Sequence, residues 1–340
     1  MEHRPLGRTG VSVSKLCLGT MMFGAWGNPD HDDSIRIIHA ALDAGINFVD
    51  TADVYSDGES EEIVGKALAG GRRDDIVLAT KVGFPMGDDP NRRGASRRRI
   101  IKGVEDSLRR LNTDWIDLYQ IHRPDPSTDI EETLGALTDI VQQGKVRYVG
   151  SSTYPAAEIV EAQWAARDRR LHRYVTEQPP YSILVRGIEA DVLPTCARYG
   201  MGVIPWAPLA NGWLSGRWRK GAEQPGSTRA DRLPARYDLS LPGNQRKLDV
   251  ADELAQLAEA AGMTLIELAI AFVLNHPAVT APIIGPRTME HLESQLPAAD
   301  VVLDAALLDR IDELVPPGSN LNPDDAGWQI PALQPAARRR

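Results

Sequence analysis

The stretch NFVDTADVYSDGESEEIVGKAL, residues 47–68, begins as an apolar strand and ends as a helix. The strand runs directly into Asp50, and Tyr55 follows five residues later. Acidic residues then precede apolar residues at helical spacing, as is typical of a helix start. A polar cluster between a buried strand and its helix has no packing role, so this junction raises the question of what Asp50 and Tyr55 do.

The same strand–helix unit recurs along the chain. Most strand-like runs are followed by a segment with apolar residues at i, i+3 and i+4, often ending in glycine. This alternation predicts parallel pairing, and eight units predict a closed (β/α)₈ barrel. The G-x-G-x-x-G fingerprint of an open dinucleotide-binding sheet is absent after the first strand. The eight runs cover 14–20, 46–52, 75–83, 116–122, 146–152, 174–182, 201–209 and 281–286.

Segments outside this repeat define the rest of the predicted architecture. The opening residues suit a short N-terminal hairpin, and residues 1–315 are expected to form one barrel domain. The segment 211–243, after the seventh strand, lacks a sustained period, and loops of this length are usually lids or binding loops. Residues 316–340 are rich in proline and predict an irregular tail.

Composition limits the classes of function. The net charge of −9 argues against broad nucleic-acid binding. The two cysteines have no metal-ligand spacing, which argues for a reducing compartment and against structural zinc. The first residues contain no signal-peptide-like apolar segment, and no apolar run reaches membrane-spanning length. We therefore expect a soluble, cytoplasmic protein without membrane insertion, and self-association stays open.

Polar and aromatic side chains follow the predicted strands at the end where barrel enzymes carry their chemistry. Each has a structural alternative when taken alone: Asp50 as a turn residue, Lys81 as a surface lysine, His122 as a core histidine and Tyr55 as a rim aromatic. A barrel makes these strand ends neighbours, which favours a shared site. The full series of strand ends is Thr20, Asp50, Lys81, His122, Ser151 with Ser152, Gln178 and Trp206.

The side chains in this set suit acid catalysis by a phenol. A tyrosine with a pKa near 10 is a poor proton donor at neutral pH, and an adjacent ammonium lowers that pKa. Lys81 would supply the ammonium, Asp50 would keep it charged, and His122 would hydrogen-bond at the same point. Tyr55 would then protonate an oxygen that gains negative charge. This chemistry fits carbonyl reduction if another group supplies hydride.

Six motifs together resemble the aldo-keto reductase superfamily across roughly residues 1–315. They are most similar to the branch with bacterial aryl-alcohol-dehydrogenase-like enzymes and potassium-channel beta subunits. The resemblance implies a catalytic tetrad of Tyr55 as proton donor, Lys81, Asp50 and His122, with NADPH as the cofactor. The motifs are FVDTADVYSDGESEEIVGKAL, LATKVG, DLYQIHRPD, GKVRYVGSS, WAPLANGWLSG and IIGPRTMEHLESQL.

The resemblance also implies the residues that contact NADP(H). Ser151 and Gln178 match positions that hold the nicotinamide carboxamide, and Trp206 matches the aromatic residue that stacks on its ring. Ser152 replaces an asparagine common in relatives, and His291 and Gln295 stand where glutamine and asparagine commonly meet adenine. The remaining matches are Thr20 and Met21 beside the ring, Pro208, Leu209, Gly212 and Leu214 over the pyrophosphate, and Gly285 and Arg287 at the 2′-phosphate.

The sequence determines the class of protein better than it determines the substrate or the mode of action. Trp26, Phe84 and Trp213 would form an apolar substrate wall or, equally, would pack beneath loops. The preferred hypothesis is an NADPH-dependent oxidoreductase that reduces a small-molecule aldehyde or ketone. The alternative is an NADPH-binding regulatory or redox-sensor subunit with slow reductase activity. A metal-dependent barrel hydrolase is disfavoured, because only one histidine lies at a strand end.

Overall fold

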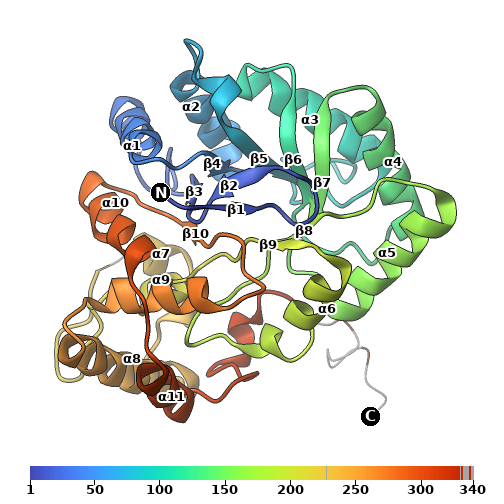
Figure 1. Ribbon diagram of the computed structural model, residues 1–340. Helices are drawn as coiled ribbons and strands as arrows, with labels where there is room; N and C mark the ends of the chain where they lie inside the picture. The colour runs from blue at the N-terminus through green and yellow to red at the C-terminus, as the bar shows by residue number, and fades with distance from the viewer. Residues whose placement is uncertain (227, 330, 332–336, 338–340) are drawn as a thin grey trace.

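The protein folds around a ring of eight parallel strands surrounded by helices (Figure 1). The computed structural model describes residues 1–226, 228–329, 331 and 337. Each strand of the ring lies within one of the predicted runs, so the (β/α)₈ prediction is confirmed. The strands are β3 (Cys17–Gly19), β4 (Phe48–Asp50), β5 (Val77–Val82), β6 (Ile116–Ile121), β7 (Val146–Ser151), β8 (Thr176–Glu177), β9 (Gly202–Val203) and β10 (Ile283–Ile284).

Backbone hydrogen bonds close the ring between its last two strands. The paired order runs from β10 through β3 to β9. The amide of Thr280 donates to Val203 O at 2.8 Å, and that of Ile283 donates to Pro205 O at 2.8 Å. Because these residues lie at and next to β9 and β10, the sheet forms a closed barrel whose strand ends share one rim.

The helices cover the outside of the barrel, and several begin at a side chain that caps the first turn. Asp30 and Ser96 accept hydrogen bonds from amides in the first turns of α1 and α3, and Thr264 forms a capping box with Glu267 at α9. The main helices are α1 (His31–Asp43), α2 (Glu59–Ala67), α3 (Arg97–Leu111), α4 (Ile130–Gln142), α5 (Ala156–Arg169), α6 (Val192–Tyr199), α8 (Pro242–Ala260), α9 (Leu265–Asn275), α10 (Met289–Gln295) and α11 (Ala305–Leu314).

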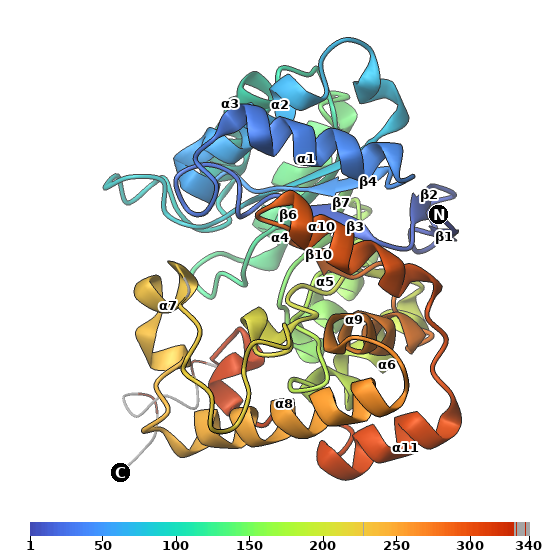
Figure 2. The ribbon, with the colours of Figure 1, turned by 90° about the vertical axis from the view of Figure 1, so that its left-hand side faces the viewer.

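The two ends of the barrel differ in what covers them. The predicted N-terminal hairpin is confirmed, and its strands β1 (His3–Pro5) and β2 (Ser12–Ser14) pair antiparallel. Figure 2 shows the hairpin on the side opposite α7 (Thr228–Arg232), which belongs to the long segment after β9. This segment also contains short 3₁₀ turns, η4 (Ala210–Gly212) and η5 (Pro234–Arg236). The long loop therefore lies at the end of the barrel opposite the hairpin.

The described part of the tail packs against the barrel. The amide of Arg186 donates to Ser319 O at 2.9 Å, and that of Leu321 donates to Leu184 O at 3.1 Å. A 3₁₀ turn, η7 (Pro323–Ala326), follows. The predicted irregular tail, 316–340, extends beyond this turn into residues 330, 332–336 and 338–340, which lie outside the described residues.

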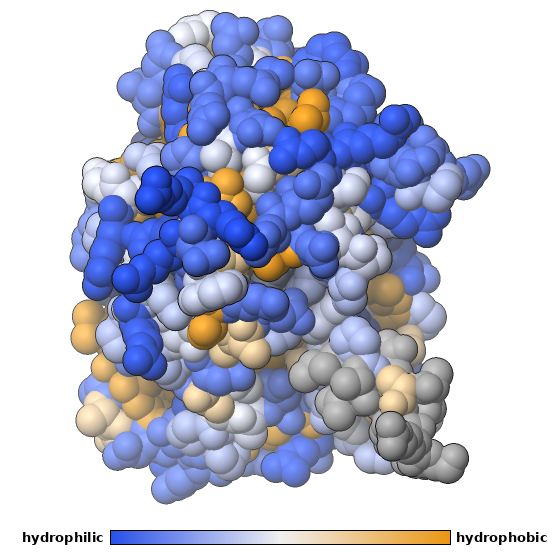
Figure 3. All heavy atoms as spheres, turned by 90° about the vertical axis from the view of Figure 1, so that its right-hand side faces the viewer, coloured by the Kyte–Doolittle hydropathy of each residue, from blue (hydrophilic) through white to orange (hydrophobic). Residues whose placement is uncertain are grey.

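Within the described residues, no individual helix combines the length and apolar character needed to cross a membrane. Helices α8 and α9 reach those criteria only as a pair bent by 93°. The face shown in Figure 3 is mostly hydrophilic, with hydrophobic side chains in small separate spots.

Candidate active site

A strained turn brings Tyr55 back over the end of β4. Asp50 ends the strand, and the 3₁₀ turn η1 (Tyr55–Gly58) follows. Ser56 and Asp57 in this turn have φ of 49° and 55°, in the left-handed region that side chains disfavour. The amide of Trp26 donates to Ser56 Oγ at 3.1 Å. Contacts with a neighbouring loop thus help hold the turn that positions Tyr55.

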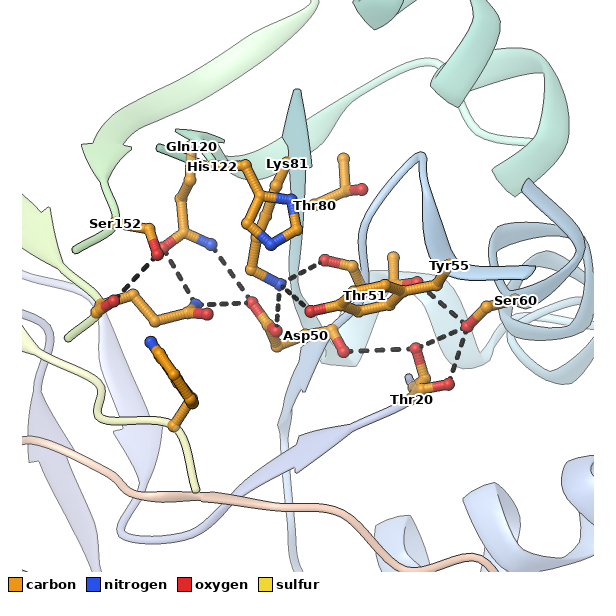
Figure 4. A network of polar contacts seen from close by, with 12 residues as sticks. Thr20, Asp50, Thr51, Tyr55, Ser60, Thr80, Lys81, Gln120, His122 and Ser152 are labelled. Atoms are coloured by element: carbon orange, nitrogen blue, oxygen red, sulfur yellow. Dashed lines mark hydrogen bonds and ion pairs between the residues drawn. The ribbon is translucent and has the colours of Figure 1, made fainter. Parts of the chain in front are cut away.

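The Lys81 ammonium contacts two other members of the predicted tetrad, Asp50 and Tyr55 (Figure 4), and His122 lies beside Tyr55. Its Nζ lies 2.5 Å from Asp50 Oδ2 and 3.1 Å from the Tyr55 hydroxyl oxygen. It also donates to Thr51 O at 2.7 Å. Lys81 and Asp50 are 0% and 2% exposed, so this ion pair is removed from water. The side chains are held by contacts on several sides, which suits a catalytic group.

The second carboxylate oxygen of Asp50 accepts two amide hydrogen bonds. Gln178 Nε2 donates to Oδ1 at 2.9 Å and Gln120 Nε2 at 3.2 Å, so the buried carboxylate is satisfied on both sides. The sequence reasoning missed Gln120 because it took only the last polar residue of each strand. Gln120 precedes His122 by two residues in a strand, and this alternation was the available signal.

Burial and neighbouring charges set the protonation states. Burial opposes the charge on Lys81, but Asp50, then Tyr55, more than offset it and raise the pKa of Lys81. Burial also raises the pKa of Tyr55, and Lys81 offsets only part of this rise. The expected lowering of the Tyr55 pKa is therefore outweighed by desolvation. Burial, with Lys81 and Arg123, lowers the pKa of His122 well below its usual value. Tyr55 thus keeps its proton and His122 is neutral at pH 7.

Two of the three predicted wall residues lie beside these groups. The rings of Phe84 and His122 meet edge-on with centroids 4.5 Å apart, and those of Trp26 and Tyr55 lie 6.1 Å apart. Both aromatics are partly exposed. Two partly exposed aromatic rings therefore lie beside Tyr55 and His122.

The third wall residue, Trp213, lies elsewhere. It is 1% exposed and stacks on Trp218 at 4.2 Å and on Tyr237 at 5.9 Å. Lys247 Nζ lies 4.9 Å from the centroid of its ring. Trp213 thus packs beneath the loop after β9, the alternative that its sequence position left open.

The adjacent serines Ser151 and Ser152 point to different partners. The Ser151 hydroxyl donates to the buried Glu177 carboxylate. The Ser152 hydroxyl donates to Gln178 O at 2.9 Å and receives a hydrogen bond from Arg123 Nη1 at 3.4 Å. Ser152 therefore contacts Gln178, the residue that donates to Asp50, whereas the Ser151 hydroxyl is hydrogen-bonded to Glu177.

Glu177 is a buried carboxyl that the sequence reasoning did not select. It is 0% exposed and also accepts from the amide of Tyr154 at 3.0 Å. Burial raises the pKa of Glu177 to about 7, although hydrogen bonds from Ser151 and the backbone act in the other direction. The carboxyl thus fixes the β7–α5 loop and titrates near neutral pH.

The C-terminal tail reaches the ring of Trp206. Trp206 Nε1 donates to Thr153 Oγ1 at 3.3 Å. A Cβ on Gly327 would lie 2.8 Å from Trp206 Cζ2, and Gly327 has φ of 80°. The tail can approach Trp206 this closely only because Gly327 has no side chain.

The predicted adenosine end brings three basic residues near one another. Thr288 caps α10, and Arg287 N donates to His291 Nδ1 at 3.4 Å. Burial and the charges of Arg287 and Arg217 lower the pKa of His291. Arg217, on the loop after β9, was missed because that loop has no sequence period. Gly285 is exposed nearby, whereas Gln295 is buried.

The remaining predicted cofactor residues lie along the same rim. Thr20 Oγ1 contacts Ser60 Oγ at 2.9 Å and donates to Asp50 O at 3.3 Å, and Met21 is half-buried. In the segment after β9, Pro208 is buried, and the amides of Gly212 and Leu214 donate to Leu209 O at 2.8 and 3.2 Å. These two amides are thus used within the turn itself.

The barrel and this strand-end arrangement agree with comparisons to known proteins. The model of the aldo/keto reductase family matches residues 15–316, and the chain belongs to this family of oxidoreductases. An uncharacterized oxidoreductase, YrpG, of Bacillus subtilis is 40% identical over 96% of this chain and 100% of its own length. The aldo-keto reductase YhdN of the same organism is 36% identical over 86% of this chain and 87% of its own length.

A relative of a different kind is also similar. A probable voltage-gated potassium channel subunit beta of Arabidopsis thaliana is 36% identical over 93% of this chain and 97% of its own length. The family thus includes proteins named for enzymatic and for channel-associated roles.

Proposed function

We propose that the protein is an NADPH-dependent reductase of aldehydes or ketones. The observation that carries this proposal is the contact of Lys81 Nζ with both the Tyr55 hydroxyl, at 3.1 Å, and Asp50, at 2.5 Å. Neutral His122 lies beside them, with its ring centroid 5.8 Å from that of Tyr55. A protonated phenol and a neutral imidazole can both donate to one carbonyl oxygen.

Each residue then has a specific part in the reduction. His122 orients the carbonyl oxygen, and Tyr55 transfers its proton to that oxygen as negative charge develops. Lys81 stabilises the phenolate left on Tyr55, and Asp50 keeps Lys81 charged and in place. Gln178, Ser152 and Trp206 would hold the nicotinamide of bound NADPH, which would supply the hydride, and the product would be an alcohol.

The residues along the rim fit the proposed cofactor. Gln178 and Ser152 offer polar groups for the nicotinamide carboxamide, and Trp206 offers a ring face for the nicotinamide ring. The Ser151 hydroxyl is instead hydrogen-bonded to Glu177. Arg287 and Arg217 provide positive charge near His291 for a 2′-phosphate that NADH lacks. These features support NADPH.

Trp26 and Phe84 favour substrates with an apolar or aromatic body. Both rings are partly exposed and lie next to Tyr55 and His122, respectively. An aromatic aldehyde placed between them would present its carbonyl oxygen to the proposed donors.

A regulatory subunit with slow reductase activity is the second candidate. It is favoured by the 36% identity to a probable potassium channel beta subunit over most of both chains. In this case NADPH would be bound and oxidised slowly, and the protein would act through a partner or another copy of itself.

A comparison of single-turnover and steady-state rates tests the proposal and separates the two candidates. The protein is loaded with NADPH, mixed with 4-nitrobenzaldehyde and followed by NADPH absorbance, and a panel of aldehydes, ketones and sugars is then screened. A reductase should turn over repeatedly with at least one compound. A single oxidation followed by very slow turnover would favour the regulatory role, and no oxidation by any compound would contradict both.

A further inference from the structure

Arg123 lies at the candidate active site, and only one nitrogen of its guanidinium is hydrogen-bonded to the protein. It directly follows His122, and its Nη1 donates to His122 O at 2.6 Å and to Ser152 Oγ at 3.4 Å. Its Cζ lies 5.4 Å from the centroid of Phe84 and 5.5 Å from that of Trp206. Nε and Nη2 have no acceptor among the described residues, so these N–H groups remain available to a ligand.

Two further arginines approach from the loop after β9. Arg232, at the end of α7, lies over the ring of Trp26 with its Cζ 4.1 Å from the centroid. Arg236, in η5, is close enough to Arg123 that its charge adds to burial in lowering the pKa of Arg123. Among the residues that the structure describes, no carboxylate forms an ion pair with any of the three arginines.

Two buried acids near these arginines already have other partners. Asp325 pairs with Lys247 at 2.8 Å, and Glu177 accepts hydrogen bonds from Ser151 and the Tyr154 amide. Positive groups that gather without a counter-charge repel one another. Arg123 and Arg236 therefore repel each other, and a bound anion would relieve this repulsion.

We infer that the carbonyl substrate carries an anionic group, a carboxylate or a phosphate, which Arg123 binds while Arg232 and Arg236 attract it. This inference rests on the proposed reductase function and specifies its substrate class. Arg123 can form a bidentate contact with either anion, because both present paired oxygens. The rings of Trp26 and Phe84 would contact the apolar body between the anion and the carbonyl.

The test compares anionic aldehydes with neutral aldehydes that share the same aromatic ring. Steady-state kcat/KM with NADPH is measured for 4-carboxybenzaldehyde and its neutral methyl ester, and for 4-formylphenyl phosphate and neutral 4-methoxybenzaldehyde. We expect a preference of about tenfold or more for at least one anionic member over its neutral partner, because charge-assisted hydrogen bonds discriminate by at least this factor. The larger preference identifies the carboxylate or the phosphate. The preference should shrink as salt rises.

Variants assign the preference to these residues. Arg123→Gln should remove most of it, and Arg232→Gln and Arg236→Gln should each reduce it about two- to fivefold, as for partly exposed charges. The control is Arg167→Gln on α5, which removes an exposed arginine without an ion pair in the described part of the chain. It should leave the preference unchanged.

Three outcomes would overturn the inference. The neutral aldehydes could be reduced as well as the anionic ones, which leaves the reductase function standing. The three variants could weaken NADPH binding in fluorescence titrations as much as they weaken turnover of the anionic aldehyde, which would assign the arginines to the cofactor. No reduction of any of the four aldehydes would remove this substrate class, and failure of the wider carbonyl panel as well would contradict the proposed function.

Discussion

The strand ends and the loops that surround them are built on different principles. At the ends of β4 and β5, Asp50 and Lys81 are almost fully buried and paired, in positions set by the register of the sheet. On the loop after β9, Arg217 and Arg232 are exposed. Their neighbours include a hydroxyl of the same loop and an aromatic ring. In the proposed function, the buried pair at the strand ends would serve the chemistry and the exposed arginines of the loop would contact the ligand.

The largest effect is expected where the proposed chemistry depends on one hydroxyl. Tyr55→Phe keeps the ring beside Trp26 and removes only the proton donor. We expect kcat to fall about 10²–10⁴-fold, the usual contribution of a general acid, with NADPH affinity unchanged. Reduction of 4-nitrobenzaldehyde measures the first, and fluorescence titration measures the second. Wild-type turnover would show that Tyr55 is not the donor.

Lys81→Met, at the same site, should lower both the reductase activity and the free energy of unfolding. It leaves the buried Asp50 carboxylate without its counter-charge, and breaking such a pair typically costs about 3–5 kcal/mol. Activity should fall, and the pH profile should shift because Tyr55 loses the adjacent ammonium. Urea unfolding and kcat/KM against pH measure the two effects.

The matched control for this change is the double variant Asp50→Asn with Lys81→Met. It removes both charges, so it should regain part of the lost stability but none of the activity. If Lys81→Met alone unfolds like the wild type, the amides of Gln120 and Gln178 suffice to hold the Asp50 charge.

Glu177→Gln should change how stability depends on pH. The pKa of Glu177 is raised from 4.5 to about 7, so the folded state binds its proton more tightly than the unfolded state. The stabilisation that Glu177 gives the folded state is fully present below about pH 4.5 and is lost as pH rises through about 7. Glutamine cannot ionise, so the free energy of unfolding of the variant relative to wild type should rise by up to about 3 kcal/mol between pH 4.5 and 8.

Urea unfolding at several pH values measures this difference. The control is Glu253→Gln, an exposed position on α8, which should show no such trend. A constant difference between Glu177→Gln and wild type would mean that Glu177 does not titrate in this range.

A substitution in the loops around the strand ends should have a smaller effect, limited to one cofactor. Arg287→Ala should weaken NADPH by about one to two decades, the equivalent of one charge-assisted hydrogen bond, and leave NADH nearly unchanged. The preference for NADPH should also shrink as salt rises. Fluorescence titration of both cofactors measures this. Equal losses would assign Arg287 to the fold or the pyrophosphate.

Much of the fold could be predicted because its signals are local and repeated. Each strand of the ring lies inside a predicted run, since apolar runs and helix starts recur in every unit. The strand ends that carry Asp50, Lys81 and His122 follow from the same register. Strand lengths were overestimated, as for β8, where only Thr176 and Glu177 pair regularly.

Other features depend on packing that local sequence does not encode. The sequence cannot show that the Ser151 hydroxyl contacts Glu177 while the Ser152 hydroxyl contacts Gln178. Which of two neighbouring serines faces which partner depends on the path of the backbone. The raised pKa of Tyr55 likewise results from burial by several segments. The stacking of Trp213 depends on how the loop after β9 folds back.

The contact of Gly327 with Trp206 makes the two ends of the chain unequal as attachment points. Met1 lies beside Gly45, next to the hairpin side of the barrel and away from the strand-end rim. The segment 319–327 instead pairs with the backbone at Leu184 and Arg186 before it reaches Trp206. An enzyme immobilised on an electrode or bead through its first residue would keep the rim turned to solution. Anchoring through the other end would transmit any pull to the aromatic ring beneath the proposed nicotinamide.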